Sequence, residues 1–237
     1  LGNVDAISIC VPTPLRKSGQ PDVSHVIDAT NRLATVLPTD CVVILESTVY
    51  PGATEEVVVE HLATSGWTVG ENIFVAFSPE RIDPGNESYD VTDIPKVIGG
   101  VTDACGDRAV ALYEPVFEQT VRVSGSAEAE FVKLLENTFR SVNIGLINEL
   151  ALTADRMNVD IWDVINAAAT KPFGYMPFYP GPGLGGHCIP IDPQQLSWRA
   201  KQQGFETRFI DLADRINRGM PEHVVDRIGA LLNEDGV

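Results

Sequence analysis

The sequence predicts an α/β fold in which a partial, doubly wound parallel sheet is followed by an all-helical central domain. Two observations lead to this prediction. Over the first 123 residues, short apolar segments alternate with amphipathic helical segments, which is typical of parallel strands joined by helices. From residue 127 to residue 157 there is no proline and one glycine, Gly145, and apolar residues recur at helical spacing. We expect the boundary between the two parts near residues 124–128.

The strands of the sheet are expected in short apolar segments that end at turn-forming residues. The first segment, VDAISICV, is followed by Pro12 and Pro14, which interrupt the hydrogen bonding of a central strand. The first helix is expected to end at Pro38. Strands are expected at residues 4–11, 41–45, 72–77, 96–99 and 119–123, and helices at residues 22–37, 54–63 and 105–117.

The second half is expected to be helical apart from one loop. Asp160 precedes an apolar helical segment, and its side chain is a suitable N-cap. The expected helices cover residues 127–157 (as one helix or two stacked ones), 160–169, 193–203 and 208–217, the last continuing past Pro221.

The composition argues against several classes of function. A formal net charge of −16, from 33 acidic and 17 basic residues, argues against nucleic-acid binding. No apolar run approaches the roughly 20 residues of a membrane span, and the first residues do not resemble a signal peptide. Four cysteines without a CxxC spacing argue against a metal site or a disulfide scaffold and favour a cytoplasmic protein. These cysteines are Cys10, Cys41, Cys105 and Cys188; we expect the first three to lie in apolar strand or helix contexts.

The most informative stretch is a segment rich in glycine and proline, residues 178–193. It surrounds Cys188 and carries Asp192 four residues later. A thiolate is a strong nucleophile, and a loop with free N–H groups lowers the pKa of a thiol. The alternative is a buried cysteine that packs as a small apolar residue. We expect a rigid loop without helix or strand because the segment contains Pro180, Pro182, Pro190, Pro193, Gly181, Gly183, Gly185 and Gly186.

Three of these glycines, Gly181, Gly183 and Gly186, match the spacing of the dinucleotide-binding motif GxGxxG. That motif binds a pyrophosphate where it follows a strand and opens a helix. The surrounding prolines are expected to exclude both elements, so we reject the match as a cofactor loop.

Polar or turn-forming residues follow each of the first three predicted strands. In doubly wound sheets, ligands bind at the carboxyl ends of the strands, so these residues are candidates for a binding site. The alternative is that they are ordinary turns. The three segments are Pro12-Thr13-Pro14, Glu46-Ser47-Thr48 and Ser78-Pro79-Glu80.

Lys133 and Asn137 are four residues apart in the predicted long helix and therefore project from the same face. Such a pair can donate hydrogen bonds to an oxyanion. The alternative for Lys133 is a solvated charge on the helix surface.

Five motifs in order resemble the nucleotide-sugar 6-dehydrogenase family, which contains the UDP-glucose and GDP-mannose dehydrogenases. Residues 171–183 are most similar to the UDP-N-acetylglucosamine 6-dehydrogenase branch. Pro84, where UDP-glucose enzymes often have a second glutamate, favours the same branch. The motifs are Val11-Pro-Thr-Pro14, Glu46-Ser-Thr48 with Pro51-Gly52, Ser78-Pro-Glu80, Lys133-x-x-x-Asn137 and Gly185-Gly-His-Cys188-x-x-x-Asp192.

The resemblance also implies a domain organisation. The family begins with a strand, a true GxGxxG turn and a helix, and it ends with a third domain. We therefore expect an interior fragment that is inactive on its own. Residues 1–125 would be the rest of a Rossmann-like NAD-binding domain, residues 126–220 a central helical domain for dimerisation and catalysis, and residues 221–237 a connecting helix. A homodimer through the central helices is expected.

The implied reaction is the oxidation of the C6 alcohol of a UDP-sugar to a carboxylate, with two NAD⁺ reduced. Cys188 would attack the intermediate aldehyde, and the resulting thiohemiacetal would be oxidised to a thioester that water hydrolyses. Lys133 and Asn137 would stabilise the oxyanions, and Asp192 would orient Lys133 or a water. Glu80 would be the base for hydrolysis, and Thr48 would position the water.

Binding residues are implied in the same way. The expected NAD contacts are Pro12, Thr13, Pro14, Ser47 and Thr48. The expected substrate contacts are Phe178, Tyr179, Gly181, Gly183, Gly185, Gly186, Lys133 and Asn137. His187 is expected to be a loop or substrate contact rather than the base of a Cys–His pair.

Three alternatives remain open at this point. The substrate could be UDP-glucose or GDP-mannose. A Cys–His hydrolase is a second alternative, although no nucleophile elbow supports it. The chain could also be a non-catalytic dimerisation module made of its long helices.

Overall fold

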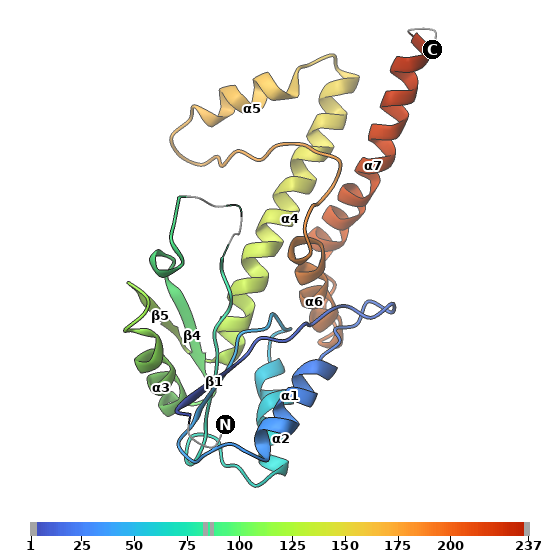
Figure 1. Ribbon diagram of the computed structural model, residues 1–237. Helices are drawn as coiled ribbons and strands as arrows, with labels where there is room; N and C mark the ends of the chain where they lie inside the picture. Colours follow the sequence, from blue (N-terminus) through green and yellow to red (C-terminus); the bar gives the residue numbers. More distant parts are fainter. Residues whose placement is uncertain (1–3, 83–84, 86–87, 235–237) are drawn as a thin grey trace. The chain divides into compact units, whose positions relative to one another are not determined.

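The computed structural model describes residues 4–82, 85 and 88–234 (Figure 1). The chain divides into two compact units, Leu1–Leu135 and Glu136–Val237. The first unit holds a five-stranded sheet with helices, and the described part of the second contains helices and no strand. The predicted fold class is confirmed. Pro84 lies outside the described residues.

The sheet differs from the prediction in the direction of its last two strands. β1 to β3 are parallel to one another and β5 is parallel to β4, but β4 is antiparallel to β3. The described part of the β3–β4 connection contains only the short 3-10 helix η2 (Val91–Asp93), whereas a parallel connection usually needs a crossover helix. The expectation of a fully parallel sheet is therefore wrong at this step. The strands, in spatial order, are β1 (Ala6–Ile9), β2 (Val42–Leu45), β3 (Phe74–Phe77), β4 (Lys96–Gly100) and β5 (Thr120–Val123).

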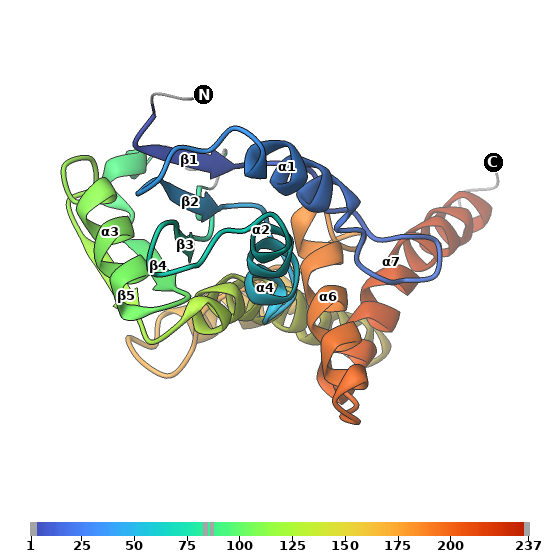
Figure 2. The same cartoon turned by 90° about the horizontal axis from the view of Figure 1, so that it is seen from below.

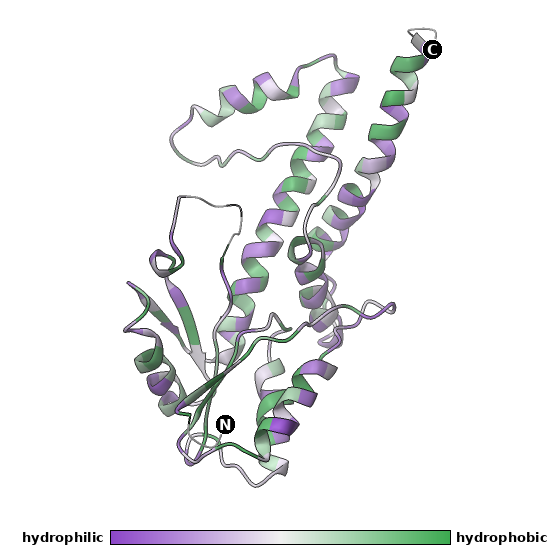
Figure 3. Cartoon of the chain, viewed as in Figure 1, coloured by the Kyte–Doolittle hydropathy of each residue, from purple (hydrophilic) through white to green (hydrophobic). Residues whose placement is uncertain are grey.

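Helices cover both faces of the sheet, so it is doubly wound. Figure 2 shows α1 and α2 on one face and α3 on the other. β2 and β3 are buried at every position, which explains why their sequences are continuous apolar runs (Figure 3). Cys105 and Ala109 of α3 pack into the same core. The helices are α1 (Ser24–Ala34), the π-helix η1 (Thr54–Val59), which leads directly into α2 (Glu60–Thr64), and α3 (Asp103–Tyr113).

The helical part begins with α4 (Ser126–Arg156), a single continuous helix that starts in the first unit. It is followed by α5 (Ile161–Ala169), α6 (Cys188–Gln202) and α7 (Arg208–Glu234). α4 and α7 lie side by side (Figure 1), and a Cβ atom on Gly145 of α4 would lie 3.1 Å from the Cα atom of Ala213.

Two sequence predictions about helix starts have different outcomes. Asp160 is the N-cap of α5, since its carboxylate accepts a hydrogen bond from the N–H of Trp162 at 2.8 Å, as predicted. α6, however, begins at Cys188, and Pro190 and Pro193 lie inside it, so the expectation of a non-helical segment up to residue 193 is wrong.

The two prolines of α6 differ in their effect on its backbone hydrogen bonds. Pro190 is the third residue of α6, where a backbone N–H has no helical partner in any case. Pro193 removes one helical hydrogen bond. Residues 171–187 contain no regular structure, so the rejection of the GxGxxG match rests on the missing strand alone.

No helix in the described ranges combines the length and the apolar character needed to cross a membrane.

Candidate active site

Hydrogen bonds join the turns that follow β1 and β2. The Val11 N–H donates to Ser47 Oγ at 2.7 Å, and Thr13 Oγ1 donates to the Thr48 carbonyl at 2.6 Å. Ser47 Oγ in turn donates to the Ile9 carbonyl at 3.3 Å. Because these strands are parallel, their carboxyl ends meet at one edge of the sheet. The structure therefore brings together Thr13, Ser47 and Thr48.

A hollow of about 230 Å³ lies beside the end of β1, next to Pro12. It contains two basic side chains and one acidic one. Its lining residues are Val11, Pro12, His25, Asp28, Ala29 and Arg32.

Glu46, the first residue after β2, belongs to a cluster of polar side chains in which Lys96 is buried and Glu46 and Tyr113 are partly buried. Its carboxylate lies 3.0 Å from Lys96 Nζ, and the two side chains are only 15% and 7% exposed. The Tyr113 hydroxyl donates to this carboxylate, and Ser8 Oγ donates to it at 3.1 Å. Lys96 Nζ also lies 5.0 Å from the centre of the Tyr113 ring. These contacts therefore hold Glu46, the residue immediately before Ser47, in place.

Burial, reinforced by the hydrogen bond to Glu46, raises the pKa of Tyr113. The hydroxyl therefore stays protonated and continues to donate to the carboxylate.

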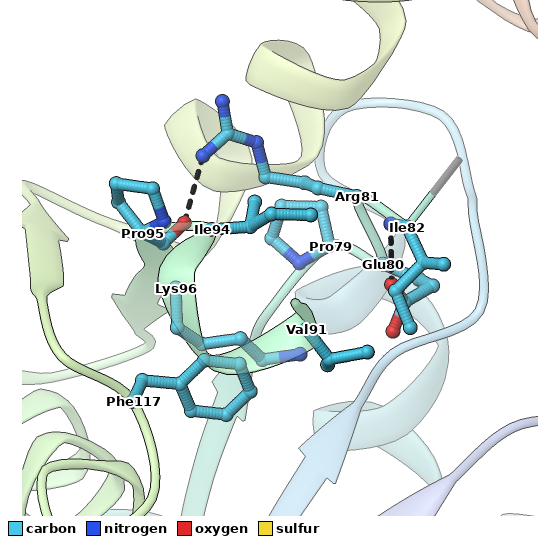
Figure 4. Close-up of a pocket in the computed structure, with 9 residues that line it drawn as sticks. All are labelled: Pro79, Glu80, Arg81, Ile82, Val91, Ile94, Pro95, Lys96 and Phe117. Carbon is cyan, nitrogen blue, oxygen red and sulfur yellow. Dashed lines mark hydrogen bonds between the residues drawn. The ribbon is translucent and has the colours of Figure 1, made fainter. Parts of the chain in front are cut away.

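Glu80 follows β3 at the same edge and borders a cavity of about 20 Å³, enough for roughly one water molecule (Figure 4). Its Oε1 accepts a hydrogen bond from the Ile82 N–H at 2.6 Å. Arg81 Nη1 donates a hydrogen bond to the Pro95 carbonyl at 2.7 Å (Figure 4). The Glu80 side chain is exposed.

Glu130 of α4 is fully buried and accepts three hydrogen bonds from the segment that opens η1. They come from the Gly52 N–H at 2.5 Å, the Thr54 N–H at 2.7 Å and Thr54 Oγ1 at 2.6 Å. Burial raises the pKa of Glu130 to about 7, although the three donors favour the charged form. Glu130 thereby fixes the Pro51-Gly52 segment that follows the 46–48 turn.

In the second unit, Asn137 of α4 and Asp192 of α6 form a buried hydrogen-bonded pair. Asn137 Nδ2 donates to Asp192 Oδ2 at 2.6 Å, and both side chains are buried. Asp192 is the fifth residue of α6, so it is not the N-cap of that helix. Lys133, one turn before Asn137 on α4, is partly exposed.

Cys188 is the first residue of α6, is exposed and forms no disulfide. The alternative of a buried packing cysteine is therefore wrong for this residue. His187 occupies the N-cap position, is exposed, and its side chain makes no capping hydrogen bond. Among the other cysteines, Cys41 and Cys105 are buried as expected, but Cys10 is exposed because β1 ends at Ile9.

Aromatic contacts hold the beginning of the loop before Cys188. Phe178 lies edge-on to Phe139 of α4, with ring centres 5.8 Å apart. Tyr179 stacks on Trp162 of α5 at 5.9 Å. Further along, Cβ atoms added at Gly185 and Gly186 would meet nothing within 4 Å, so open space lies beside the loop just before Cys188.

The residues expected in catalysis are divided between the two units. Thr48, Glu80 and Lys133 belong to the first, and Asn137, Cys188 and Asp192 to the second.

Sequence reasoning missed several polar residues that support these positions. The signal was present in α4, where polar or small side chains occupy a stripe that helical spacing assigns to the buried face. That stripe contains Glu130, Asn137, Ser141, Gly145 and Asn148, all of them buried, together with the apolar Leu134. Lys96 and Tyr113 gave no such signal, since they are isolated polar residues in segments predicted only as a strand and a helix.

Among the described residues, no group of His, Cys, Asp and Glu side chains is arranged to hold a metal ion.

Comparison with known proteins gives one consistent result. The NAD binding domain of the UDP-glucose/GDP-mannose dehydrogenase family matches residues 1–117, and the central domain of the same family matches residues 127–219. The chain is 41% identical to a UDP-N-acetyl-D-glucosamine 6-dehydrogenase from Pseudomonas aeruginosa, over 93% of this chain and 52% of that protein.

Solved structures agree with this comparison. A UDP-D-ManNAc dehydrogenase from Pyrococcus horikoshii superimposes with a TM-score of 0.92 at 34% identity, covering 99% of this chain and 55% of that one. A UDP-glucose dehydrogenase from Pyrobaculum islandicum gives a TM-score of 0.87 at 28% identity, covering 98% of this chain and 54% of that one. The chain thus spans about half the length of the relatives it matches. With both domains matched in order and the fold shared throughout, the chain belongs to the UDP-glucose/GDP-mannose dehydrogenase family.

Proposed function

We propose that the protein containing this chain is an NAD-dependent nucleotide-sugar 6-dehydrogenase that oxidises the C6 alcohol of a UDP-N-acetylhexosamine to a carboxylate. The observation that carries the proposal is the arrangement at the start of α6. An exposed Cys188 stands one turn before a buried Asp192, which Asn137 holds through a 2.6 Å hydrogen bond. A nucleophile next to a fixed polar pair suits covalent capture of an aldehyde.

The chemical roles follow from the properties of each side chain. The Cys188 sulfur adds to the C6 aldehyde and gives a thiohemiacetal; after the second oxidation the sulfur is part of a thioester, which water cleaves to carboxylate and thiol. Lys133 and Asn137 donate to the oxygen that carries negative charge at each tetrahedral stage. Asp192 orients Asn137 and, in this proposal, Lys133 or a water.

Hydrolysis of the thioester needs a base and a positioned water. We assign the base to Glu80, whose carboxylate is exposed at the edge of the sheet, and the positioning of the water to Thr48. Phe178, Tyr179 and the loop glycines 181, 183, 185 and 186 would contact the sugar and the base of the nucleotide.

The residues at the carboxyl edge of β1 and β2 fit an NAD cofactor. Pro12, Thr13, Pro14, Ser47 and Thr48 would hold it, beside a hollow that contains Arg32 and His25. When bound, NAD⁺ accepts the hydrides that the two oxidations release. The domain limits that accompany this proposal are residues 1–125 for the NAD-binding part, 126–220 for the central domain and 221–237 for a connecting helix.

The choice of an N-acetylhexosamine as the sugar rests on the relatives and on residues 171–183. The relatives include enzymes named for UDP-N-acetyl-D-glucosamine and for UDP-D-ManNAc, and one named for UDP-glucose. The sequence of residues 171–183 favours the N-acetylhexosamines. A cytoplasmic location fits four cysteines that form no disulfide.

A substrate panel tests the proposal. The complete gene product is incubated with NAD⁺ and, separately, with UDP-N-acetylglucosamine, UDP-N-acetylmannosamine, UDP-glucose and GDP-mannose, and NADH is followed by absorbance. We expect two NADH per sugar consumed and preference for an N-acetylhexosamine. Turnover of UDP-glucose or GDP-mannose alone would transfer the assignment to that branch, and no turnover of any sugar would contradict the proposed function.

We also propose a homodimer. One face of α4 exposes apolar side chains at helical spacing, and burial against a second copy would remove this surface from water. These residues are Phe131, Leu135, Phe139, Leu146 and Leu150, which are 44–56% exposed.

A further inference from the structure

Two buried asparagines connect the loop before Cys188 to the helices α4 and α7. The Gly181 N–H donates to Asn148 Oδ1 at 2.9 Å, and Asn148 Nδ2 donates to Asn217 Oδ1 at 2.9 Å. Asn217 Nδ2 donates to the backbone carbonyl of Ser141 at 3.1 Å. The result is one unbroken line of hydrogen bonds from the backbone of α4 to the backbone of the loop.

The Ser141 carbonyl fixes the direction of this line. A carbonyl only accepts, so Asn217 must present its NH₂ group to it and its oxygen to Asn148. Asn148 must then present its own NH₂ group to Asn217, which leaves its oxygen for the Gly181 N–H. Asn148 is 0% exposed and Asn217 3% exposed, so water does not compete for these groups. Each buried amide therefore specifies the orientation of the next.

A second contact holds the same part of the loop. Gly183 has a φ of +105°, and a Cβ atom there would lie 2.8 Å from the Asn217 carbonyl oxygen. Glycine is therefore required at this position, and the loop backbone runs directly against α7. With the ring contacts of Phe178 and Tyr179, the loop is held at four points over residues 178–183, and Cys188 follows five residues later.

We propose that Asn148 and Asn217 are positioning residues, which fix the 178–183 loop so that it binds the nucleotide sugar and leads Cys188 to the reacting carbon. The inference rests on the proposed function and adds to it an explanation of what holds the 178–183 loop in its conformation. Neither side chain reaches solvent, so both act through Gly181 and Gly183 and not on the ligand itself.

The first arm of the test does not depend on enzymatic activity. In the 237-residue chain, hydrogen exchange of peptides covering residues 178–186 is measured for Asn148→Ala, Asn217→Ala and the control Asn143→Ala. Asn143 also lies on α4, but its side chain donates to the Phe139 carbonyl one turn earlier on the same helix and not to the loop. We expect about five- to tenfold faster loop exchange in Asn148→Ala, the factor that corresponds to one typical hydrogen bond. A smaller increase is expected in Asn217→Ala, which leaves the Asn148–Gly181 bond in place, and none in the control.

The second arm measures catalysis in the complete gene product. A residue that only packs helices would lower the melting temperature without changing the kinetics of the folded enzyme. A positioning residue changes them, so at temperatures well below melting we expect Asn148→Ala to raise the KM for the nucleotide sugar and to lower kcat/KM by about 10–100-fold. The KM for NAD⁺ is expected to stay within about twofold, because the asparagines contact only the loop and the helices.

The outcomes separate the two proposals. Unchanged loop exchange in Asn148→Ala and Asn217→Ala, or wild-type kinetics in a variant whose loop exchanges faster, overturns the positioning role. If Asn148→Ala does not fold, Asn217→Ala decides the question by the same two measurements. If the wild-type enzyme oxidises no nucleotide sugar, the proposed function fails, and with it the catalytic half of this inference. Loop exchange still decides whether Asn148 holds Gly181.

Discussion

Cys188 differs from the other three cysteines in its surroundings. Cys105 is buried and structural, since its sulfur accepts hydrogen bonds from the Val75 N–H and from Thr102 Oγ1, both at 3.2 Å. Burial raises the pKa of the Cys41 thiol, which disfavours the reactive thiolate. Cys10 is exposed but follows a strand of the sheet. Cys188 alone combines exposure with the first position of a helix and a buried carboxylate one turn later.

The first prediction concerns Cys188→Ser in the complete gene product. The thiol is needed only after the first hydride has left, so the variant should keep substrate binding and part of the first oxidation. It should then stall, because an alkoxide is a poorer leaving group than a thiolate. Mass spectrometry after mixing with UDP-sugar and NAD⁺ should show a covalent sugar adduct on the serine, whereas Cys10→Ser should turn over normally. Formation of the uronate at the wild-type rate by Cys188→Ser would disprove the thioester route.

The second prediction concerns Glu130, whose folded-state pKa of about 7 lies above its ordinary value of 4.5. Between these values the native state binds the proton more tightly, so stability falls as pH rises from 4.5 to about 7. The shift corresponds to roughly 3 kcal/mol at most. We expect the stability of the wild type relative to Glu130→Gln to be highest near pH 4 and to fall as the pH rises to about 7, as measured by urea denaturation. A difference that does not change with pH would show that Glu130 does not titrate in this range.

Among the elements of the sheet, Lys96 of β4 forms a largely buried ion pair with Glu46, the residue that follows β2. Lys96→Met leaves the Glu46 carboxylate buried without its cation, although Tyr113 and Ser8 still donate to it. We expect a loss of about 3 kcal/mol in unfolding free energy. The double variant Lys96→Met/Glu46→Gln should recover about 1–2 kcal/mol, because no uncompensated charge remains.

The control for this pair is Arg108→Met. Arg108 also lies over an aromatic ring, 4.5 Å from the centre of Phe74, but its ion pair with Asp40 is exposed. We expect a loss below about 1 kcal/mol. If Lys96→Met costs no more than this control, the Lys96–Glu46 pair does not anchor the 46–48 turn.

The elements that the sequence predicted correctly are those whose local pattern agrees with their tertiary role. β2 and β3 are apolar because both faces are buried, and Asp160 caps α5 because its side chain bonds to the adjacent backbone. The direction of β4 is not a local property, since it depends on the path of the whole connection from β3. The start of α6 was missed for a related reason, because Pro190 and Pro193 each disfavour a helix locally but occupy positions where α6 tolerates them.

Across the whole molecule, the residues that carry the proposed chemistry can be recognised from the sequence, whereas the residues that hold them in place cannot. Glu80, Lys133 and Cys188 bear reactive or charged groups and could be named from sequence alone. Asn148, Asn217 and Lys96 act through contacts with residues far away in the sequence, such as the Asn148–Asn217 bond across 69 residues and the Lys96–Glu46 pair across 50, so their partners become visible only in the folded chain. The sequence signal for such residues is a polar residue at a position that helical spacing assigns to the buried face of a helix, as at Asn148.

The last prediction tests the assembly of two copies through α4. Leu135 and Leu146 lie on the exposed apolar face, at 56% and 53% exposure, so a carboxylate there would be costly only if a partner covers it. We expect Leu135→Glu/Leu146→Glu to convert a dimer into a monomer in light scattering at micromolar concentration, with an unchanged circular dichroism spectrum. Val116→Glu is the matched control, since Val116 is 57% exposed in the first unit and away from α4 in sequence. A wild-type chain that is already monomeric, or a double variant that remains dimeric, would show that this face of α4 is not the interface.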